Sequence, residues 1–142
     1  MKRFNGFQNL GDCRGGLVAI GNFDGVHRGH QSMIHTLVKL SHERKISAVV
    51  MTFDPHPISI LRPQLAPPCL STIEYRAELF EASGVDCLIV FPTNRSLLNL
   101  APEEFFEQIV CQELEAKGLV EGENFCFGRD RSGDISTLKT LC

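Results

Sequence analysis

Two histidines, His27 and His30, stand three residues apart directly after a glycine-rich stretch. Gly21, Gly25 and Gly29 follow one another at four-residue intervals there, and glycine permits sharp bends and close approach of a ligand to the backbone. Imidazole N–H groups can donate hydrogen bonds to phosphate. A helix beginning at these histidines would add free N–H groups and a positive dipole end, which both favour an anion. These residue types and spacings predict a phosphate-binding turn.

Four kinds of site compete for this pattern. A P-loop needs a Lys-Ser or Lys-Thr pair after its glycines, and none follows here. A dinucleotide fingerprint needs glycines in the spacing G-x-G-x-x-G, which this stretch lacks. A metal site would need a third ligand beside the two histidines, for which Asp24 or His56 could serve. The fourth is nucleotidyl transfer, in which two histidines at a helix start contact a triphosphate.

The segments around the turn predict the elements that position it. The apolar run 17–20 indicates a buried strand, and apolar residues at helical spacing indicate a helix over about 31–43. The β-rich run 46–53 indicates a second strand. A strand, a helix and a strand in about 35 residues form one βαβ unit, so we expect parallel strands.

A proline-rich segment, 54–68, follows the second strand and holds five of the seven prolines. Because proline lacks an N–H group and fixes φ, we expect neither helix nor central strand there. The segment opens with Asp54-Pro55-His56-Pro57 at the carboxyl end of a strand, which is the edge where open α/β sheets bind ligands. The sequence therefore predicts a functional loop.

The remaining chain continues the alternation of helices and strands. We read residues 1–16 as a lead-in without clear periodicity, and residues 71–74 as a capping box that starts a helix ending near Gly84. Further on we expect a strand at 87–91, a helix from 102 to 118, a strand at 119–120, a polar loop at 122–133 and a last helix capped by Asp134. This order predicts an α/β domain with a doubly wound parallel sheet.

Composition narrows the function classes. The chain has 142 residues, a net charge of −3 and a pI near 5.9, which argues against nucleic acid or an anionic membrane surface as a partner. No apolar segment approaches 18 residues, and the N-terminus does not resemble a signal peptide. Six cysteines without a C-x-x-C pair indicate thiols in a reducing compartment, so we expect a cytoplasmic location.

Three motifs carry a family resemblance. His27-Arg28-Gly29-His30 looks like the HxGH signature of the nucleotidyltransferases that include cytidylyltransferases and pantetheine-phosphate adenylyltransferase. The longer stretch 21–31 resembles the FMN adenylyltransferase (FAD synthetase) module of prokaryotic bifunctional riboflavin kinase/FAD synthetases. The stretches 52–57 and 122–128, the latter followed by Gly133-Asp134, are similar to that family's second motif and its flavin-site motif.

The resemblance implies a Rossmann-like HxGH nucleotidyltransferase fold over 17–142 and the reaction of ATP with FMN to give FAD and pyrophosphate. It implies Mg²⁺ bound with ATP and no direct metal ligation by the protein. The family's second ATP motif, I-S-S-T-x-x-R, does not follow Gly133. Ser71, Thr72 and Arg76 resemble it superficially, but we interpret them as a helix start. The riboflavin kinase domain expected in a full-length chain is absent from this sequence, so we expect a module incomplete at its C-terminus.

The resemblance also implies site residues. It makes His27 and His30 catalytic, and places on the ATP side Gly21, Asn22, Phe23, Asp24, Gly25 and Gly29. On the FMN side it places Asp54, Pro55, His56, Pro57, Asn124, Phe125, Phe127, Gly128 and Arg129.

From the residues alone several alternatives stay open. Asp24 could orient the turn or a metal-bound water, and at least one of Phe125 and Phe127 is expected in the core. Arg129 and Arg131 could hold phosphate or be solvated. Three rival functions remain: another nucleotidyltransferase with a different acceptor, a non-catalytic nucleotide- or flavin-binding fragment, and a metal-binding regulatory domain.

Overall fold

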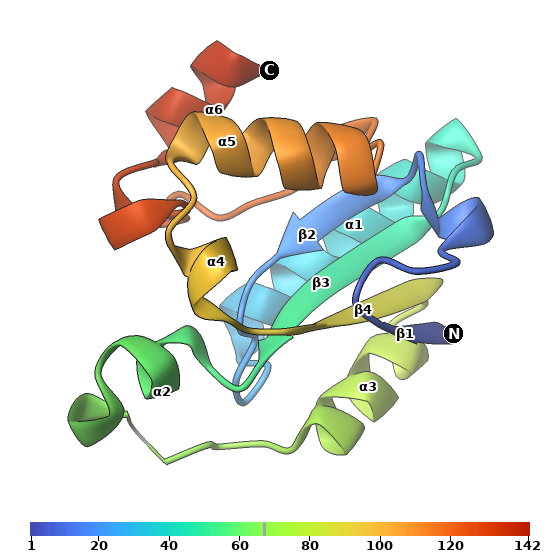
Figure 1. The fold of residues 1–142 in the computed structure, drawn as a ribbon. Coiled ribbons are helices and arrows are strands. Elements are labelled where there is room, and N and C mark those ends of the chain that lie inside the picture. The colour runs from blue at the N-terminus through green and yellow to red at the C-terminus, as the bar shows by residue number, and fades with distance from the viewer. Residues whose placement is uncertain (67) are drawn as a thin grey trace.

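A computed structural model describes residues 1–66 and 68–142. Pro67, one prolyl residue of the predicted loop, lies outside the described residues. The described chain forms a five-stranded sheet in which every pairing is parallel and the strand order is β1-β4-β3-β2-β5 (Figure 1). The strands are β1 (Lys2–Asn5), β2 (Leu17–Ile20), β3 (Ala48–Asp54), β4 (Cys87–Pro92) and β5 (Gly118–Leu119).

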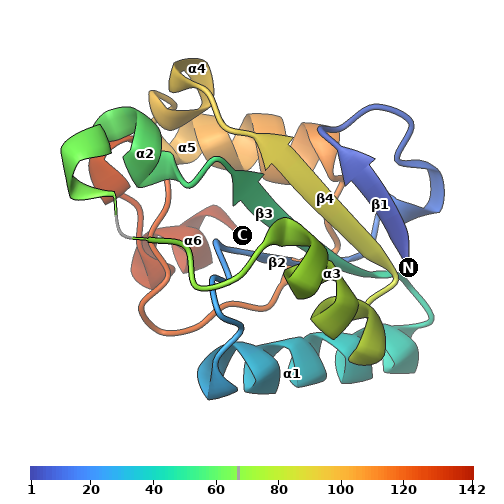
Figure 2. The ribbon, with the colours of Figure 1, turned by 90° about the horizontal axis from the view of Figure 1, so that it is seen from below.

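Helices cover both faces of this sheet (Figure 2). α1 and α3 lie on one face, where Leu37 and Phe80 enter one buried apolar cluster. α4, α5 and α6 contribute Leu97, Phe105 and Leu138 to a second cluster on the other face. The helices are α1 (Arg28–Arg44), α2 (Pro57–Leu61), α3 (Ile73–Ala82), α4 (Arg95–Leu98), α5 (Pro102–Phe105), its π-helical continuation Phe106–Glu113, and α6 (Ile135–Leu141). The predicted doubly wound α/β fold is confirmed.

The topology leaves a switch point between β2 and β5. The strands β2, β3 and β4 follow one another toward one edge of the sheet, whereas β5 adds on the opposite side of β2. All residues of β2 are buried, as expected for a strand covered on both faces. Open α/β sheets bind ligands in the crevice outside the carboxyl ends of the strands at such a point. The glycine-rich turn follows β2 and therefore begins at this crevice.

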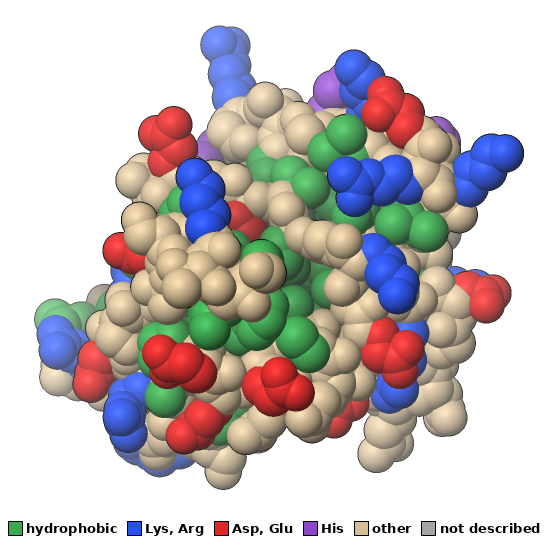
Figure 3. All heavy atoms as spheres, turned by 90° about the horizontal axis from the view of Figure 1, so that it is seen from above, with side chains coloured by type: hydrophobic (Ala, Val, Ile, Leu, Met, Phe, Trp, Pro, Cys, Tyr) green, Lys and Arg blue, Asp and Glu red, His purple; other side chains and the backbone are tan. Residues whose placement is uncertain are grey.

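The short helices leave part of the second cluster at the surface. Phe106, Ile135 and Leu141 pack against that cluster while remaining only partly buried. Seen from the side of α5 and α6, hydrophobic side chains gather near the middle of the face, between acidic and basic ones (Figure 3).

Two predictions about irregular segments are wrong. The lead-in is not featureless, because Lys2–Asn5 form β1 and extend the sheet beside β4. The proline-rich segment is not a helix-free loop, because it contains α2 and a 3-10 turn at Pro63–Leu65. Both begin with proline, which the first turn of a helix accepts because the N–H group there has no partner within the helix.

Smaller differences concern element ends. Thr72, rather than Ser71, caps α3 by accepting a hydrogen bond from the Tyr75 N–H group at 3.1 Å. Ser71 is instead used by the glycine-rich turn. α4 was not predicted at all, although its cap Asn94 accepts from the Leu97 N–H group at 2.8 Å. Asp134 caps α6 as predicted, whereas α1 begins three residues before the predicted position 31 and is capped by His27.

The expectation of free thiols is wrong for one pair of cysteines. Cys13 and Cys87 are joined by a disulfide with their Cα atoms 6.0 Å apart. It ties the segment before β2 to the start of β4, and both residues are buried. Cys69, Cys111, Cys126 and Cys142 are free.

Candidate active site

The glycine-rich turn between β2 and α1 uses the left-handed backbone region three times. Phe23, Gly25 and Val26 have φ values of 52°, 77° and 41°. The side chains of Phe23 and Val26 are almost fully buried, which anchors the strained backbone in the core. Phe23, predicted on the ATP side, thus points into the protein, where its ring meets Phe80 edge-on at 5.5 Å between centroids.

His27 caps α1. Its Nδ1 atom accepts hydrogen bonds from the backbone N–H groups of Gly29 at 3.2 Å and His30 at 3.4 Å. These two groups are therefore not free for an anion, which corrects the expectation of an open helix start. An Nδ1 atom that accepts must be unprotonated, so the proton of the neutral ring is on Nε2. The exposed His27 side chain can consequently donate a hydrogen bond from Nε2.

His30 stacks on His27. The two ring centroids are 3.6 Å apart with 20° between the planes, and the His30 ring also meets Phe23 edge-on at 5.2 Å. Burial lowers the pKa of His30 below its ordinary value of 6.5, and the neighbouring His27 imidazole acts in the same direction. His30 Nδ1 is buried and has no hydrogen-bond partner among the described residues. The neutral ring is thus held in one orientation with one nitrogen unsatisfied.

Asn22 presents a second unsatisfied polar atom. Its Oδ1 atom is buried without a hydrogen-bond partner in the described part of the chain. Its carbonyl oxygen, by contrast, accepts from Thr52 Oγ1 at 3.0 Å and Arg76 Nη1 at 2.6 Å. Buried polar atoms are usually paired, so the orphan atoms of Asn22 in the turn and of His30 in the first turn of α1 indicate a place where a ligand supplies partners.

Asp24 ties the turn to the end of the proline-rich segment. Its carboxylate accepts hydrogen bonds from the N–H groups of Leu70 and Ser71 and from Ser71 Oγ, all at 2.9–3.0 Å. Although burial raises the pKa of Asp24, hydrogen bonds from Leu70 and Ser71 outweigh it and, with the charge of Arg76, lower the pKa below 3.8. Asp24 could orient the turn or a metal-bound water, and its hydrogen bonds to Leu70 and Ser71 support the first of these roles.

The second motif lies beside this turn. Asp54 ends β3, the Asp54–Pro55 peptide bond is cis, and Thr93 Oγ1 donates to the Pro55 carbonyl at 2.6 Å. His56 Nδ1 accepts from the Ile58 N–H group at 3.1 Å and so caps α2, which leaves Nε2 as a donor. Burial lowers the pKa of His56; the charge of Asp24 raises it and that of Arg76 lowers it further. His56 is therefore within electrostatic reach of the turn.

The third motif divides between surface and core. Phe127 is buried, and Phe125 stacks on it with 5.5 Å between centroids and 13° between planes while staying partly exposed. Asn124 and Arg129 are exposed. Gly128 has φ 78° and lies so close to Pro102 that a Cβ atom would be 2.8 Å from its nitrogen, so the backbone requires glycine there.

One side chain connects the third motif with the turn. Glu121 Oε1 accepts a hydrogen bond from the Ile20 N–H group at 2.7 Å, directly before Gly21. Burial raises the pKa of Glu121 to about 9, although the hydrogen bond from Ile20 opposes this shift.

The structure joins the first two motifs through Thr52, whose Oγ1 donates to the Asn22 carbonyl, and Asp24 ties the turn to Leu70 and Ser71, just beyond the proline-rich segment. The structure places the third motif at the same sheet edge through Glu121. Thr52 belongs to the predicted second motif, although it is not among the predicted site residues, whereas Glu121 and Arg76 were not predicted as parts of this region. The only sequence signal for Arg76 is its spacing from Ser71 and Thr72, which superficially resembles the family's second ATP motif. We interpret that spacing as a helix start.

Fold and site together define a class. A glycine-rich turn at the switch point of a parallel sheet, followed by two histidines at a helix start, belongs to a Rossmann-like domain of the nucleotidyltransferase type. Comparison with known families places the chain more closely: the family model described as FAD synthetase matches residues 11–142. The chain belongs to the FAD synthetase family.

Relatives agree with this placement. The chain is 34% identical over 142 residues to a bifunctional riboflavin kinase/FMN adenylyltransferase of Buchnera aphidicola subsp. Schizaphis graminum, covering 99% of this chain and 46% of the relative. It is 31% identical to the protein of the same description from Escherichia coli K12 and 35% identical to that from Pseudomonas fluorescens, with 98% of this chain and 45% of the relative covered in each case. The chain spans about half the length of the curated relatives it matches.

A solved structure supports the fold alone. The crystal structure described as a macrolide-efflux protein from Streptococcus pneumoniae superposes with a TM-score of 0.80 at 24% identity, covering 99% of this chain and 46% of that one. Within residues 1–66 and 68–142, no helix has the length and apolar character needed to span a bilayer.

Proposed function

We propose that this domain catalyses adenylyl transfer from ATP to FMN, giving FAD and pyrophosphate. The proposal rests chiefly on the stacked pair His27 and His30 at the switch point. There a donor nitrogen of His27 and unsatisfied atoms of His30 and Asn22 accompany the glycine-rich turn. The FAD synthetase family supplies the substrate class.

In this reaction a phosphate oxygen of FMN attacks the α-phosphorus of ATP in line, a P–O bond forms, and the bond to pyrophosphate breaks. No covalent intermediate with the protein is required. His27 Nε2–H and His30 act as hydrogen-bond donors to the phosphate oxygens, on which charge grows in the transition state. Asp24 and Ser71 hold the turn in place, and His56 Nε2–H is available to the FMN phosphate at the neighbouring strand end.

Mg²⁺ would accompany ATP and neutralise the leaving pyrophosphate when bound. The described residues contain no group of three His, Cys, Asp or Glu side chains that could hold a metal ion, and both Asp24 oxygens already accept backbone N–H groups. The donor set therefore suits a metal carried by the nucleotide rather than one bound directly by the protein.

The longer context is also a proposal. We infer that the domain acts beside a riboflavin kinase domain, as the descriptions of the curated relatives suggest. The proposed location is the cytoplasm, and the proposed partners are small molecules rather than nucleic acid or membrane. The 142-residue chain alone is expected to bind ATP or FMN weakly and to turn over slowly.

The experiment is FAD formation from FMN and ATP, followed with the 142-residue chain and with a longer chain that includes the portion found in relatives. His30→Ala in the longer chain should reduce kcat by about 10²–10³, the typical cost of losing one transition-state donor. Near-normal turnover by this variant would remove His30 from the mechanism. Nucleotide binding without any turnover in the longer chain would favour a non-catalytic binding domain.

A further inference from the structure

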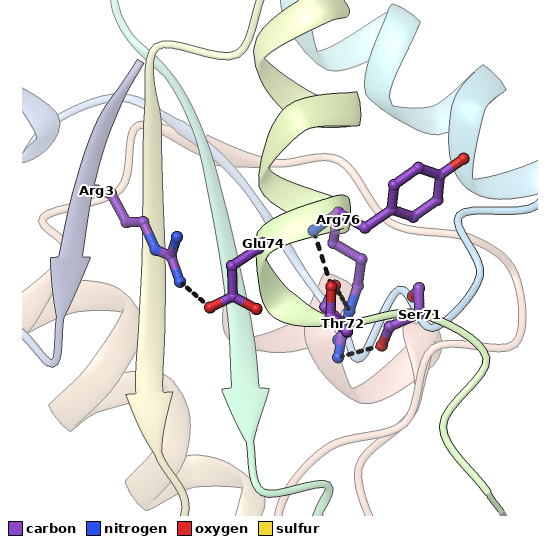
Figure 4. Close-up of polar contacts among 6 residues, drawn as sticks. Arg3, Ser71, Thr72, Glu74 and Arg76 are labelled. Carbon is purple, nitrogen blue, oxygen red and sulfur yellow. Dashed lines mark hydrogen bonds and ion pairs between the residues drawn. The ribbon is translucent and has the colours of Figure 1, made fainter.

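Arg76 is a buried cation close to the glycine-rich turn. It lies near the start of α3, and only 6% of the residue is exposed. Its guanidinium group donates to three carbonyl oxygens: Nη1 to Asn22 at 2.6 Å, Nη2 to Ser71 at 3.4 Å and Nε to Thr72 at 3.4 Å. Figure 4 shows the group turned toward the Ser71–Thr72 segment.

Among the residues that the structure describes, no acidic side chain neutralises Arg76 by direct contact. Across the described ranges, no carboxylate oxygen lies within 4.0 Å of its nitrogen atoms. Asp24, which is near enough to interact electrostatically, has both oxygens engaged with Leu70 and Ser71. Glu74 lies on the same helix but pairs with Arg3 at 3.4 Å, on the other side of the α3 start in Figure 4.

A buried cation without an ion-pair partner is costly. Carbonyl dipoles satisfy its hydrogen bonds but do not cancel its charge, and proteins rarely retain such a group in the core. The cost is offset where an anion binds nearby. Arg76 meets that condition because its closest hydrogen bond goes to Asn22, the second residue of the predicted phosphate turn.

The charge of Arg76 extends to both halves of the candidate site. It contributes to the lowered pKa of Asp24 on the turn and of His56 on the second motif. One hydrogen bond thus joins Arg76 to Asn22, 54 positions earlier in the sequence, and the charge of Arg76 acts on a residue of each motif.

We propose that Arg76 is a positioning residue for polyphosphate: it fixes the Asn22 carbonyl and supplies the buried positive charge that attracts the pyrophosphoryl part of a nucleoside triphosphate to the turn. This role rests on the proposed function for the identity of the ligand. The Ser71–Arg76 segment would then contribute to ligand binding as well as starting α3.

The test measures binding of inorganic pyrophosphate and of ATP to the 142-residue chain by calorimetry or ligand-observed NMR at low and moderate salt. Arg76→Gln removes the charge but keeps N–H donors, and Arg76→Lys keeps the charge. Arg3→Gln is the matched control, because it removes one exposed arginine from the same region. Since a unit charge at an effective dielectric of about 20 acts strongly on a polyanion, Arg76→Gln should weaken pyrophosphate binding about tenfold or more.

Support requires that Arg76→Lys stays within about threefold of the unaltered chain, that Arg3→Gln changes little, and that Arg76→Gln lowers the salt dependence of binding. An NMR titration provides a readout without ligand: the pKa of His56 should rise in Arg76→Gln and not in Arg76→Lys. If Arg76→Gln fails to fold, a folded Arg76→Lys that binds pyrophosphate normally supports the charge role.

Three results would overturn the inference. These are unchanged pyrophosphate affinity in Arg76→Gln, a folded Arg76→Lys that no longer binds, and no pyrophosphate binding by the unaltered chain. Because none of these measurements involves FAD formation, the outcome separates this inference from the proposed function. A chain that binds pyrophosphate through Arg76 but makes no FAD would refute only the latter.

Discussion

Asp24 and Ser71 bind each other across 47 residues of sequence. The Asp24 carboxylate accepts from Ser71 N at 2.9 Å and Ser71 Oγ at 3.0 Å, while Ser71 Oγ accepts from the Gly25 N–H group at 2.9 Å. This closed set of hydrogen bonds joins the turn after β2 to the end of the proline-rich segment after β3. The carboxyl edges of two neighbouring strands are thereby held in one arrangement.

Asp24→Asn should lower the free energy of unfolding at pH 7 by about 1 kcal/mol, a modest value because the carboxylate is partly solvated. The folded-state pKa of Asp24 lies below its ordinary value of 3.8, so the stabilisation is present above about pH 4 and disappears as the pH falls through the folded-state pKa. Urea unfolding at pH 7 and at pH 2.5 would measure this. A stability difference between the variant and the unaltered chain that is the same at both pH values would contradict it.

His27 combines a capping and a proposed catalytic role, which substitution can separate. Asparagine is among the best capping residues, so His27→Asn should preserve the melting temperature, whereas His27→Ala should cost about 1 kcal/mol through loss of the cap. Both variants lose Nε2, and FAD formation by the longer chain should fall about 10²-fold in each. Turnover that follows the melting temperature instead would show that His27 is only a cap.

Phe125 and Phe127 form a matched pair for the flavin side. Phe127 is buried against Phe105, so Phe127→Ala should destabilise the domain by about 3 kcal/mol. Phe125 is partly exposed and available for ring stacking, so Phe125→Ala should weaken FMN binding about three- to tenfold with a smaller effect on stability. Thermal unfolding and fluorescence titration with FMN would distinguish the two. Unchanged FMN affinity in Phe125→Ala would exclude the stacking role.

The sequence was sufficient for the regular elements because their signals are local. The buried run of β2, the apolar face of α1 and the Asp134 cap each depend on residues close together in the chain. The edge strand β1 was missed because Lys2, Arg3 and Asn5 are exposed and gain their structure from pairing with β4, 85 positions away in the register. Its side chains do not alternate between buried apolar and exposed polar residues, which is the pattern that predicts a strand.

The candidate site could be predicted in its motifs but not in its connections. The S-x-x-E spacing predicts a helix cap at Ser71, yet the Ser71 hydroxyl donates to Asp24 and accepts from the Gly25 N–H group. The His27 pattern indicated a helix start but not which nitrogen would cap it. Contacts such as Arg76 with Asn22 depend on how α3 packs against the turn, and a single sequence contains no periodicity that encodes this distance.

Glu121 gives a prediction with the opposite pH dependence. Its folded-state pKa of about 9 exceeds the ordinary value of 4.5, so the folded chain keeps a proton that the unfolded chain releases above pH 4.5. Stability from the protonated carboxyl is therefore complete below about pH 4.5 and is lost as the pH rises toward 9.

Glu121→Gln stays neutral and still offers an acceptor to the Ile20 N–H group. The variant should nearly match the unaltered chain at pH 5 and be more stable by about 4–5 kcal/mol at pH 8.5, because each pH unit above about 4.5 costs about 1.4 kcal/mol while the folded carboxyl keeps its proton. Urea unfolding at both pH values, with exposed Glu123→Gln as the charge control, would measure the difference. If Glu121→Gln keeps the same loss of stability between pH 5 and 8.5 as the unaltered chain, Glu121 is not protonated at the switch point.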